Sequence, residues 1–260
     1  MKWLCTFVFG IIFLFSTIEG IYPRNPYVDE ALWNDLEPYF LPEDMPVKAK
    51  LDKIFTASRV TQNLPALKVA GFKIPRLRKF AKVIVAKHPK VKGYVLKLFT
   101  DDNYLDNEWF DWKRRILGAH YIQETIDRLG YQHLFKVPKK WIYPLPTEPG
   151  PTPGSIRKNF ILVVEDMRIF SSSRNLSWWK SVAMTEELMD SIYIVFQECG
   201  LADSVYPDNL CFSRDRKMAF VDTQHFTVWP VPFFKLLPYF SSKKQQYWQS
   251  LMDHGGPVRS

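Results

Sequence analysis

Two short hydrophobic runs on either side of a polar turn, within residues 206–226, constrain the fold of this chain more than any other feature. Residues 210–212 and 218–221 have the length and composition of strands, so the segment predicts a β-hairpin. Asn209 precedes the first strand and Asp222 follows the second, and strand pairing is expected to bring them close together. Mg²⁺ takes oxygen ligands and needs only one or two from the protein when phosphates and water supply the rest. The hairpin therefore predicts a metal site at Asn209 and Asp222.

The same segment resembles a known family. Residues 207–210 (PDNL) are similar to P-[ED]-N-[LI], the end of the catalytic loop of protein kinases, and residues 222–224 (DTQ) stand where the D-F-G motif would follow. The resemblance covers roughly residues 64–226, about three fifths of the chain. It implies an α+β fold of reduced, two-lobed protein-kinase-like form, with an antiparallel N-lobe sheet carrying one helix and a shortened, mostly helical C-lobe. It also implies ATP and Mg²⁺ as ligands.

Other elements follow in the order that this resemblance requires: a strand at residues 94–99, a helix at 111–130, strands at 141–143 and 160–164, and a helix that opens at 185–187. Lys97 on the first strand is similar to the V-A-I-K lysine that holds nucleotide phosphates. Glu124 on the first helix is the acid that would pair with Lys97. The strand at 160–164 runs into a segment that resembles the hinge between lobes, so Glu165 and Met167 would border the adenine.

The position of the catalytic base departs from the family pattern. Counting back from Asn209, the aspartate of the H-R-D motif is replaced by Ser204, and Asp203 lies one residue away. A hydroxyl is a poor proton acceptor near neutral pH, so the base is absent unless a shifted loop lets Asp203 fill the role. The glycine-rich phosphate loop is also missing, since residues 69–75 contain one glycine, Gly71. The resemblance thus implies either a pseudokinase or, if the chain is active, a very divergent ATP-dependent phosphotransferase.

The N-terminus predicts export. After Lys2, residues 3–15 form an apolar run that is shorter than the ~20 residues of a bilayer span, which is typical of a signal peptide over residues 1–20. The alternative is an uncleaved membrane anchor over residues 3–18. The exported chain would keep Cys199 and Cys211, which could be a disulfide or two buried thiols.

Composition and proline placement predict the domain organisation. With 47% hydrophobic and 16% aromatic residues, the chain has the composition of a globular protein. Residues 144–158 contain five prolines and predict a loop between adjacent strands. We expect an irregular leader with one helix at residues 21–63, an N-lobe-like part at 64–167 and a shortened C-lobe-like part at 168–260.

Positive charge supports a rival interpretation. Eight Lys and Arg residues lie within residues 73–92, around a strand centred on Ile84, and the whole chain carries a net charge of +8. The chain could therefore be a non-catalytic secreted protein that uses this basic strand pair to contact an anionic surface or a protein partner. A nucleic-acid partner is disfavoured by the export signal and by the lack of recognisable stacking aromatics. The alternative is a solvated sheet edge, where lysines discourage strand addition.

Overall fold

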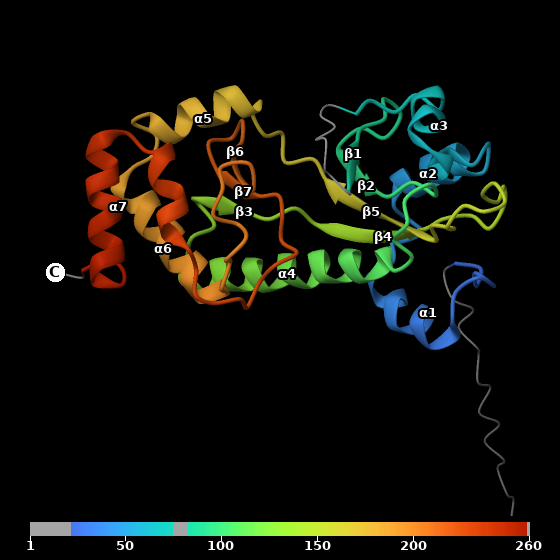
Figure 1. The fold of residues 1–260 in the computed structure, drawn as a ribbon, viewed down its shortest axis with the longest axis horizontal. Helices are drawn as coiled ribbons and strands as arrows, with labels where there is room; N and C mark the ends of the chain where they lie inside the picture. The colour runs from blue at the N-terminus through green and yellow to red at the C-terminus, as the bar shows by residue number, and fades with distance from the viewer. Residues whose placement is uncertain (1–21, 75–82, 259–260) are drawn as a thin grey trace, which may run out of the picture.

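The computed structural model describes residues 22–74 and 83–258, which form an α+β fold around a four-stranded antiparallel sheet (Figure 1). The strand order is β1-β2-β5-β4, with bounds β1 Ile84–Ala86, β2 Tyr94–Leu98, β5 Phe160–Glu165 and β4 Lys140–Pro144. Lys97 lies opposite Leu162, and Leu162 lies opposite Ile142, two residues after Lys140. Because paired residues share a face and faces alternate along a strand, Lys97 and Lys140 lie on the same face of the sheet.

The long helix α4, Glu108–Leu129, runs along this face. Trp112 anchors it, since its indole nitrogen donates a hydrogen bond to the Phe160 carbonyl at 3.2 Å and its ring lies 5.1 Å from that of Phe99. The helix ends at Gly130, whose φ of 74° is the left-handed conformation that favours glycine. The apolar spacing that predicted a helix over residues 111–130 is therefore confirmed.

Residues 22–63 pack on both faces of the sheet and are more ordered than the irregular leader expected from their composition. The rings of Trp33 and Phe40 lie 6.2 Å from that of Phe160, on the face of Lys97. They form α1 (Glu30–Leu36), α2 (Pro46–Phe55) and the 3-10 helices η1 (Glu37–Tyr39) and η2 (Val60–Gln62), and α3 (Leu64–Val69) follows. The ring of Tyr143 on β4 lies 5.7 Å from Phe55 and 6.3 Å from Tyr22. The proline and acid that suggested irregular chain instead begin helices, because Pro46 occupies the first turn of α2 and Asp29 caps α1.

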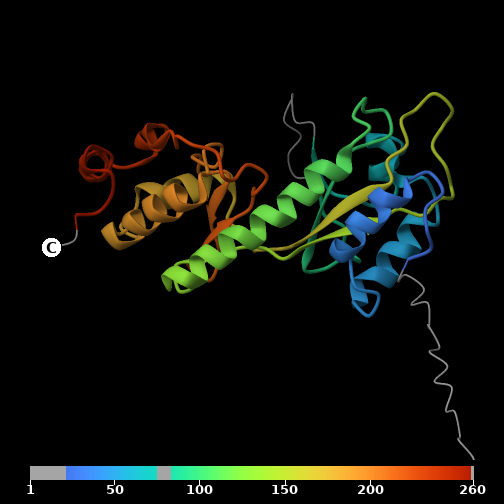
Figure 2. The ribbon, with the colours of Figure 1, turned by 90° about the horizontal axis from the view of Figure 1, so that it is seen from below.

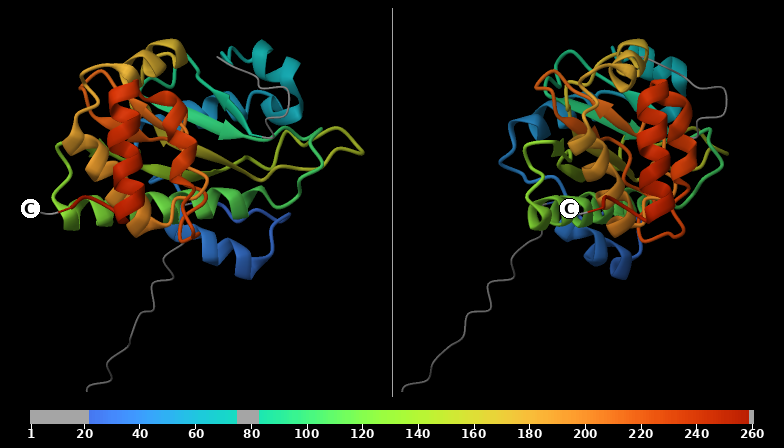
Figure 3. Two further views of the ribbon diagram at one scale, coloured as in Figure 1. Left: turned by 60° about the vertical axis from the view of Figure 1, so that its left-hand side comes forward. Right: turned by 90° about the vertical axis from the view of Figure 1, so that its left-hand side faces the viewer.

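The remaining elements form a second packed unit. They are β3 (Phe135–Lys136), α5 (Ser172–Lys180), α6 (Glu186–Cys199), β6 (Leu210–Phe212), β7 (Met218–Phe220), η3 (Phe233–Tyr239) and α7 (Ser242–His254). The predicted hairpin is confirmed as β6 and β7, and β3 adds to it in parallel with β7. Helix α6 is capped by Thr185, whose side chain accepts a hydrogen bond from the Leu188 backbone. At the end of the molecule α7 packs beside η3, where Trp248 donates to the Phe233 carbonyl at 3.0 Å (Figure 3).

Helix α4 joins two hydrophobic clusters. The first contains buried residues between Tyr22 and Val164, and the second contains buried residues between Ile122 and Leu251. The first half of α4 contributes Trp112 and Ile116 to the first cluster, and its second half contributes Ile122 and Ile126 to the second (Figure 2). The helix therefore fixes the placement of the two clusters relative to one another.

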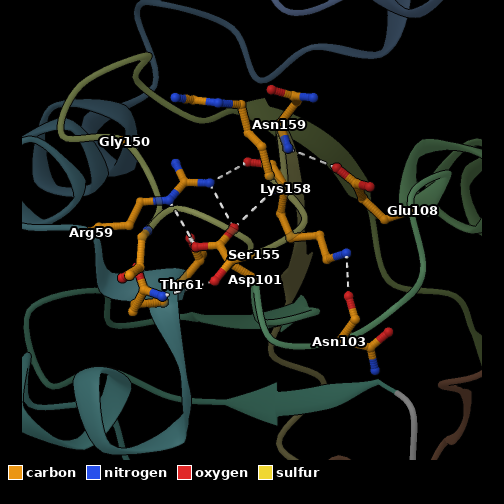
Figure 4. A network of polar contacts seen from close by, with 12 residues as sticks. Arg59, Thr61, Asp101, Asn103, Glu108, Gly150, Ser155, Lys158 and Asn159 are labelled. Atoms are coloured by element: carbon orange, nitrogen blue, oxygen red, sulfur yellow. Dashed lines mark hydrogen bonds and ion pairs between the residues drawn. The ribbon is translucent and has the colours of Figure 1, made fainter.

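A buried polar network ties the proline-rich loop to the first cluster (Figure 4). Arg59 forms an ion pair with Asp101 at 2.8 Å and donates a second hydrogen bond to the Lys158 carbonyl at 2.8 Å. The Lys158 backbone in turn donates to Asp101 at 2.9 Å, and its side chain reaches the Asn103 carbonyl at 2.9 Å. The carboxylate of Glu108 accepts from the Asn159 backbone at 2.7 Å. Residues 144–158 are thus a loop fastened at its end and do not separate two clusters.

Three further expectations can be placed. Cys199 and Cys211 are both buried free thiols, and burial raises their pKa values to about 11 and about 12, respectively. Among the helices of the described residues, none combines the length and apolar composition required to span a bilayer. The expected signal peptide over residues 1–20 lies outside the described part of the chain.

Candidate functional site

Lys97 projects from β2 toward the end of the hairpin. Its ammonium group donates to the Val221 carbonyl at 3.1 Å, one residue before Asp222. Burial lowers the pKa of Lys97 to about 8, because the charged form loses water; the Asp222 carboxylate opposes this effect and the Arg115 guanidinium adds to it. Lys97 therefore connects the sheet to the hairpin and carries a charge that is only partly neutralised.

Asp222 is held by an arginine from α4. The Nη1 atom of Arg115 donates to Oδ1 of Asp222, and its Nη2 atom donates to Oε1 of Gln224. The Arg115 side chain is only 6% exposed, whereas that of Asp222 is 38% exposed, so the pair is reachable by solvent from the Asp222 side. Burial alone would raise the pKa of Asp222, but Lys97, Arg115 and a third cation, Lys140, hold it well below its ordinary value.

Lys140 is that third cation. It is buried on β4, where its ammonium group donates to Thr223 Oγ1 and to the Arg115 carbonyl at 3.3 Å. Burial lowers the pKa of Lys140 well below its ordinary value, and the neighbouring Lys97 lowers it further. Three elements of the first cluster, β2, β4 and α4, thus each direct one cationic side chain at the segment that follows β7.

The structure also brings the expected loop residues to this place. The side-chain nitrogen of Asn209 donates to the Asp203 carbonyl at 3.0 Å, and its backbone carbonyl accepts from Val221 at 3.0 Å. The hydroxyl of the buried Ser204 lies 3.5 Å from the Asp222 carbonyl. The carboxylate of Asp203 is exposed and lies 3.5 Å from Nδ1 of His225. Asn209 therefore fixes the backbone at Asp203, and the Ser204 hydroxyl lies near the backbone carbonyl of Asp222.

Glu124 lies away from this group. It is exposed, and it follows Arg115 by nine residues on α4. At 1.5 Å and about 100° per residue, it lies about 13 Å further along the helix and on its opposite side. The acid expected to pair with Lys97 is thus replaced, at the position of α4 that faces Lys97, by the cation of Arg115.

Glu165 is the last residue of β5, and Met167 lies on the segment between β5 and α5. Glu165 is exposed, and its side chain accepts from the Lys139 backbone at 3.3 Å. Met167 is buried, and its carbonyl accepts from the ammonium group of Lys136 at 3.0 Å. The segment is therefore fastened to the loop that precedes β4.

The donor set does not fit Mg²⁺. Oδ1 of Asp222 already accepts from the Arg115 guanidinium. Across residues 22–74 and 83–258, no group of three or more His, Cys, Asp and Glu side chains could hold a metal ion. A divalent cation at Asp222 would also meet the charges of Lys97 and Arg115. The metal site that the hairpin pattern predicted is therefore not supported by the arrangement of these side chains.

The arrangement instead suits an anion. Two basic side chains, Lys97 and Arg115, stand against the single carboxylate of Asp222, and the buried Lys140 adds a third donor. Within the described residues, the Nε atom of Arg115 is buried without a hydrogen-bond partner, which is costly in a folded protein. An oxyanion that reached this nitrogen would supply the missing acceptor.

Arg115 and Lys140 were not recognised from the sequence. The only signal is that Arg115 falls three residues after Trp112 and four before Ala119, which places a charge beside the apolar stripe of α4. Lys140 directly precedes the predicted strand at residues 141–143, and its burial depends on the pairing of β4 with β5.

Two surface hollows lie elsewhere. One of about 750 Å³ is formed by η3 and α7, and the other of about 430 Å³ lies at the start of α5, lined by Ile169, Phe170, Ser171, Arg174 and Arg214. Neither includes Lys97 or Asp222. The candidate site is therefore defined by its polar contacts and not by either hollow.

The basic strand pair is described only in part. Lys73 and Lys87 form an isolated antiparallel bridge beside β1, and Lys87 pairs with Asp166 at 2.6 Å. Lys90 and Lys92 are exposed. Four other members of the pair, Arg76, Arg78, Lys79 and Lys82, lie outside the described residues.

No model of a known protein family matches the sequence, and a search of curated proteins finds no match.

Proposed function

We propose that this chain is a degenerate protein-kinase-like protein that binds the phosphates of ATP between its four-stranded sheet and the β6–β7 hairpin. The observation that carries the proposal is the contact of Lys97 with Val221, at 3.1 Å, beside an Asp222 that Arg115 also holds. A strand lysine and a post-hairpin aspartate are the two groups that the sequence resemblance assigns to nucleotide binding. They come from residues more than one hundred positions apart and meet at one place.

The order of elements supports the same proposal. A strand with a lysine, a long helix, three more strands (β3, β4 and β5), a connecting segment and two helices precede the hairpin. In this scheme the first hydrophobic cluster corresponds to an N-lobe and the second to a shortened C-lobe, with Glu165 and Met167 on the connection between them. Helix α4 would be the helix of the N-lobe, with Arg115 in place of its acid.

Binding is the primary role in this proposal, and phosphoryl transfer is secondary. Transfer depends mainly on positioning and on neutralising charge, so a weak base lowers the rate without removing the reaction in principle. Asp203 is the better candidate for the base, because its carboxylate is exposed and Asn209 holds its backbone, whereas Ser204 is a buried hydroxyl. Asp203→Asn would therefore lower the rate of any transfer and leave binding intact.

The test is the thermal melting of residues 21–260 with ATP, both with MgCl₂ and with EDTA. A ligand at about 100 times its Kd adds roughly 2.7 kcal/mol to the free energy of unfolding and raises the midpoint. We expect this rise in the wild-type chain, its loss in Lys97→Met, and its retention in Lys92→Met, which removes an exposed lysine from the turn between β1 and β2. The proposal fails if ATP leaves the midpoint unchanged under both conditions.

A second candidate function is the binding of an anionic surface by the basic strand pair. It is favoured by Lys73, Lys90 and Lys92, which are exposed near the edge strand β1. The measurement is retention on anionic lipid vesicles or on heparin at about 0.15 M salt, where surface charges are already screened beyond about 8 Å. Retention that Lys90→Met and Lys92→Met abolish, with no response to ATP, would replace the first proposal by this one.

We propose further that the chain is exported and that residues 1–20 are removed. Mass measurement of the chain recovered outside producing cells should then give a mass that begins at residue 21. Recovery in the membrane fraction with the full mass would favour the anchor over residues 3–18 instead. A protein partner or acceptor would have to be met in that same compartment.

A further inference from the structure

We infer that Arg115 takes the place of a metal ion at Asp222, so that the phosphate groups bind here without a divalent cation. This inference rests on the proposed function, because it specifies how the same site would hold the phosphates. It is not implied by the sequence resemblance, which predicts a magnesium site formed by Asn209 and Asp222.

The guanidinium of Arg115 is held in a fixed position. Its Nη1 atom donates to Asp222 and its Nη2 atom to Gln224, and Gln224 in turn donates through Nε2 to Asp111 on the preceding turn of α4. The backbone carbonyl of Arg115 accepts from Thr223 Oγ1 at 2.6 Å, which fastens the helix to the same segment. A metal ion at Oδ1 of Asp222 would have to share that oxygen with the Arg115 guanidinium.

The charge of Arg115 is permanent. A guanidinium is not deprotonated in proteins, so Arg115 keeps a full positive charge beside the Asp222 carboxylate at every accessible pH. Lys97 lies on the other side of the same segment, at the Val221 carbonyl. A divalent cation would therefore be added to a site that already carries more positive than negative charge.

The same side chain has the right chemistry for phosphate. Arginine presents N–H groups in a fork that matches phosphate oxygens, and hydrogen bonds between charged partners are the stronger ones. The Nε atom of Arg115 has no partner within the described part of the chain, although it is buried. Asp222 is 38% exposed, which leaves a side of the pair open to an incoming ligand. Arg115 and Lys97 would then neutralise the phosphate charge that Mg²⁺ would otherwise neutralise.

The experiment compares the affinity for ATP in excess EDTA with that in MgCl₂, by calorimetric titration of residues 21–260. We expect the Kd in EDTA to be equal to or lower than that in MgCl₂. Inorganic triphosphate serves as a second probe and should bind in EDTA as well, because the proposed contacts are to phosphates. Arg115→Gln should weaken binding in EDTA at least tenfold, while Arg128→Gln, an exposed arginine of the same helix, should leave it unchanged.

A second readout does not depend on ATP. Manganese(II) binding, followed by the loss of its free electron paramagnetic resonance signal, should be absent in the wild-type chain and should appear in Arg115→Gln, where the carboxylate of Asp222 is released. Arg115→Lys keeps the charge and guards against a variant that fails to fold; it should bind ATP in EDTA and exclude manganese.

The outcomes separate the two proposals. ATP binding that requires MgCl₂ overturns the role of Arg115 and leaves the proposed function standing, as does manganese binding by the wild-type chain. The absence of ATP binding under both conditions overturns the proposed function and this inference with it.

Discussion

At the scale of residues, the candidate site is defined by a positive charge, that of Arg115, where a negative charge was expected. Where an acid is expected to neutralise Lys97, α4 supplies Arg115, and the carboxylate that pairs with Arg115 and attracts Lys97 electrostatically is Asp222. Both pKa values fall, with different consequences for charge: the cations hold the pKa of Asp222 low and favour its charged form, while burial and the neighbouring guanidinium lower the pKa of Lys97 to about 8 and disfavour its charged form. The site therefore carries more positive than negative charge, and an anionic ligand would neutralise the excess.

The affinity for ATP in EDTA should therefore fall as pH rises above about 8. Protonated Lys97 attracts phosphate and neutral Lys97 does not, so the free energy of binding weakens once pH passes the pKa of the free protein, by at most tenfold in Kd per pH unit. Arg115 does not titrate in this range and Asp222 titrates far below it, which leaves Lys140 as the other group of the site that can contribute. Calorimetric titration between pH 6.5 and about 9.5 measures the effect.

The control is Lys97→Met, which should bind more weakly at pH 7 and lose the part of the fall that begins at about 8. The sign for stability is the reverse. Because the pKa of Lys97 in the folded chain lies below its ordinary 10.5, the unfolded chain binds more protons between the two values. The contribution of Lys97 to the free energy of unfolding should thus rise from pH 8 to pH 10.5. An affinity that stays constant through pH 9 would contradict the assignment of Lys97.

At the scale of elements, the close approach of α4 to the segment after β7 depends on one glycine. A Cβ atom at Gly118 would overlap the Thr223 carbonyl oxygen and lie 2.9 Å from a ring carbon of Phe226. Alanine is favoured over glycine in a helix by about 1 kcal/mol, whereas overpacking costs roughly 1–3 kcal/mol, and here the obstacle is backbone that cannot rotate aside. The steric cost should exceed the gain in helix propensity.

Gly118→Ala should therefore lower the free energy of unfolding by about 1–2 kcal/mol, measured by urea denaturation, and weaken ATP binding by displacing Thr223 and its neighbour Asp222. Glu124→Ala, an exposed change on the same helix, should alter stability by less than about 0.5 kcal/mol and leave binding unaffected. A Gly118→Ala chain as stable as the wild type would mean that the helix and this segment are not in tight contact.

Elements with a clear hydrophobic period were predictable from the sequence. The strand at Lys97, helices α4 and α6, β5 and the hairpin were all expected within a few residues of their observed bounds, because each carries its own pattern of burial. The parallel pairing of β3 with β7 was not, since a strand of two residues has no period to detect. Of the helices in residues 22–63, one was expected and is observed as α2, whereas α1 was missed for another reason: acid suggests irregular chain unless its helix-starting position is recognised.

The same distinction applies to the candidate site. Lys97, Asn209 and Asp222 could be named because each adjoins a strand or hairpin that the sequence marks. Arg115 and Lys140 could not, because their roles arise from the packing of α4 and β4 against the hairpin segment. Glu124 was chosen by residue type, and only its helical phase relative to Arg115 shows that it faces away.

For the whole molecule, the position of α4 decides how the two hydrophobic clusters behave. The helix contributes buried residues to both clusters, and Lys97, Arg115 and Lys140 of the first cluster all contact the segment that ends the hairpin of the second. The proline-rich loop is fastened by Arg59, Asp101 and Lys158 within the first cluster and provides no flexible connection between the two. Within residues 22–74 and 83–258, the two clusters are joined by a shared helix and by this polar junction.

We therefore expect the chain to unfold in a single cooperative transition, with equal calorimetric and van't Hoff enthalpies. Leu36→Ala in the first cluster and Leu251→Ala in the second should each reduce the free energy of unfolding by about 2–5 kcal/mol, and each should lower the same transition as a whole. Independent clusters would respond differently, because the change in one would leave the melting of the other in place and split the calorimetric peak. A single shifted peak in both variants would mean that the two clusters unfold together. A ligand bound at the junction would then stabilise the entire molecule, so that the melting midpoint can serve as the readout for ATP.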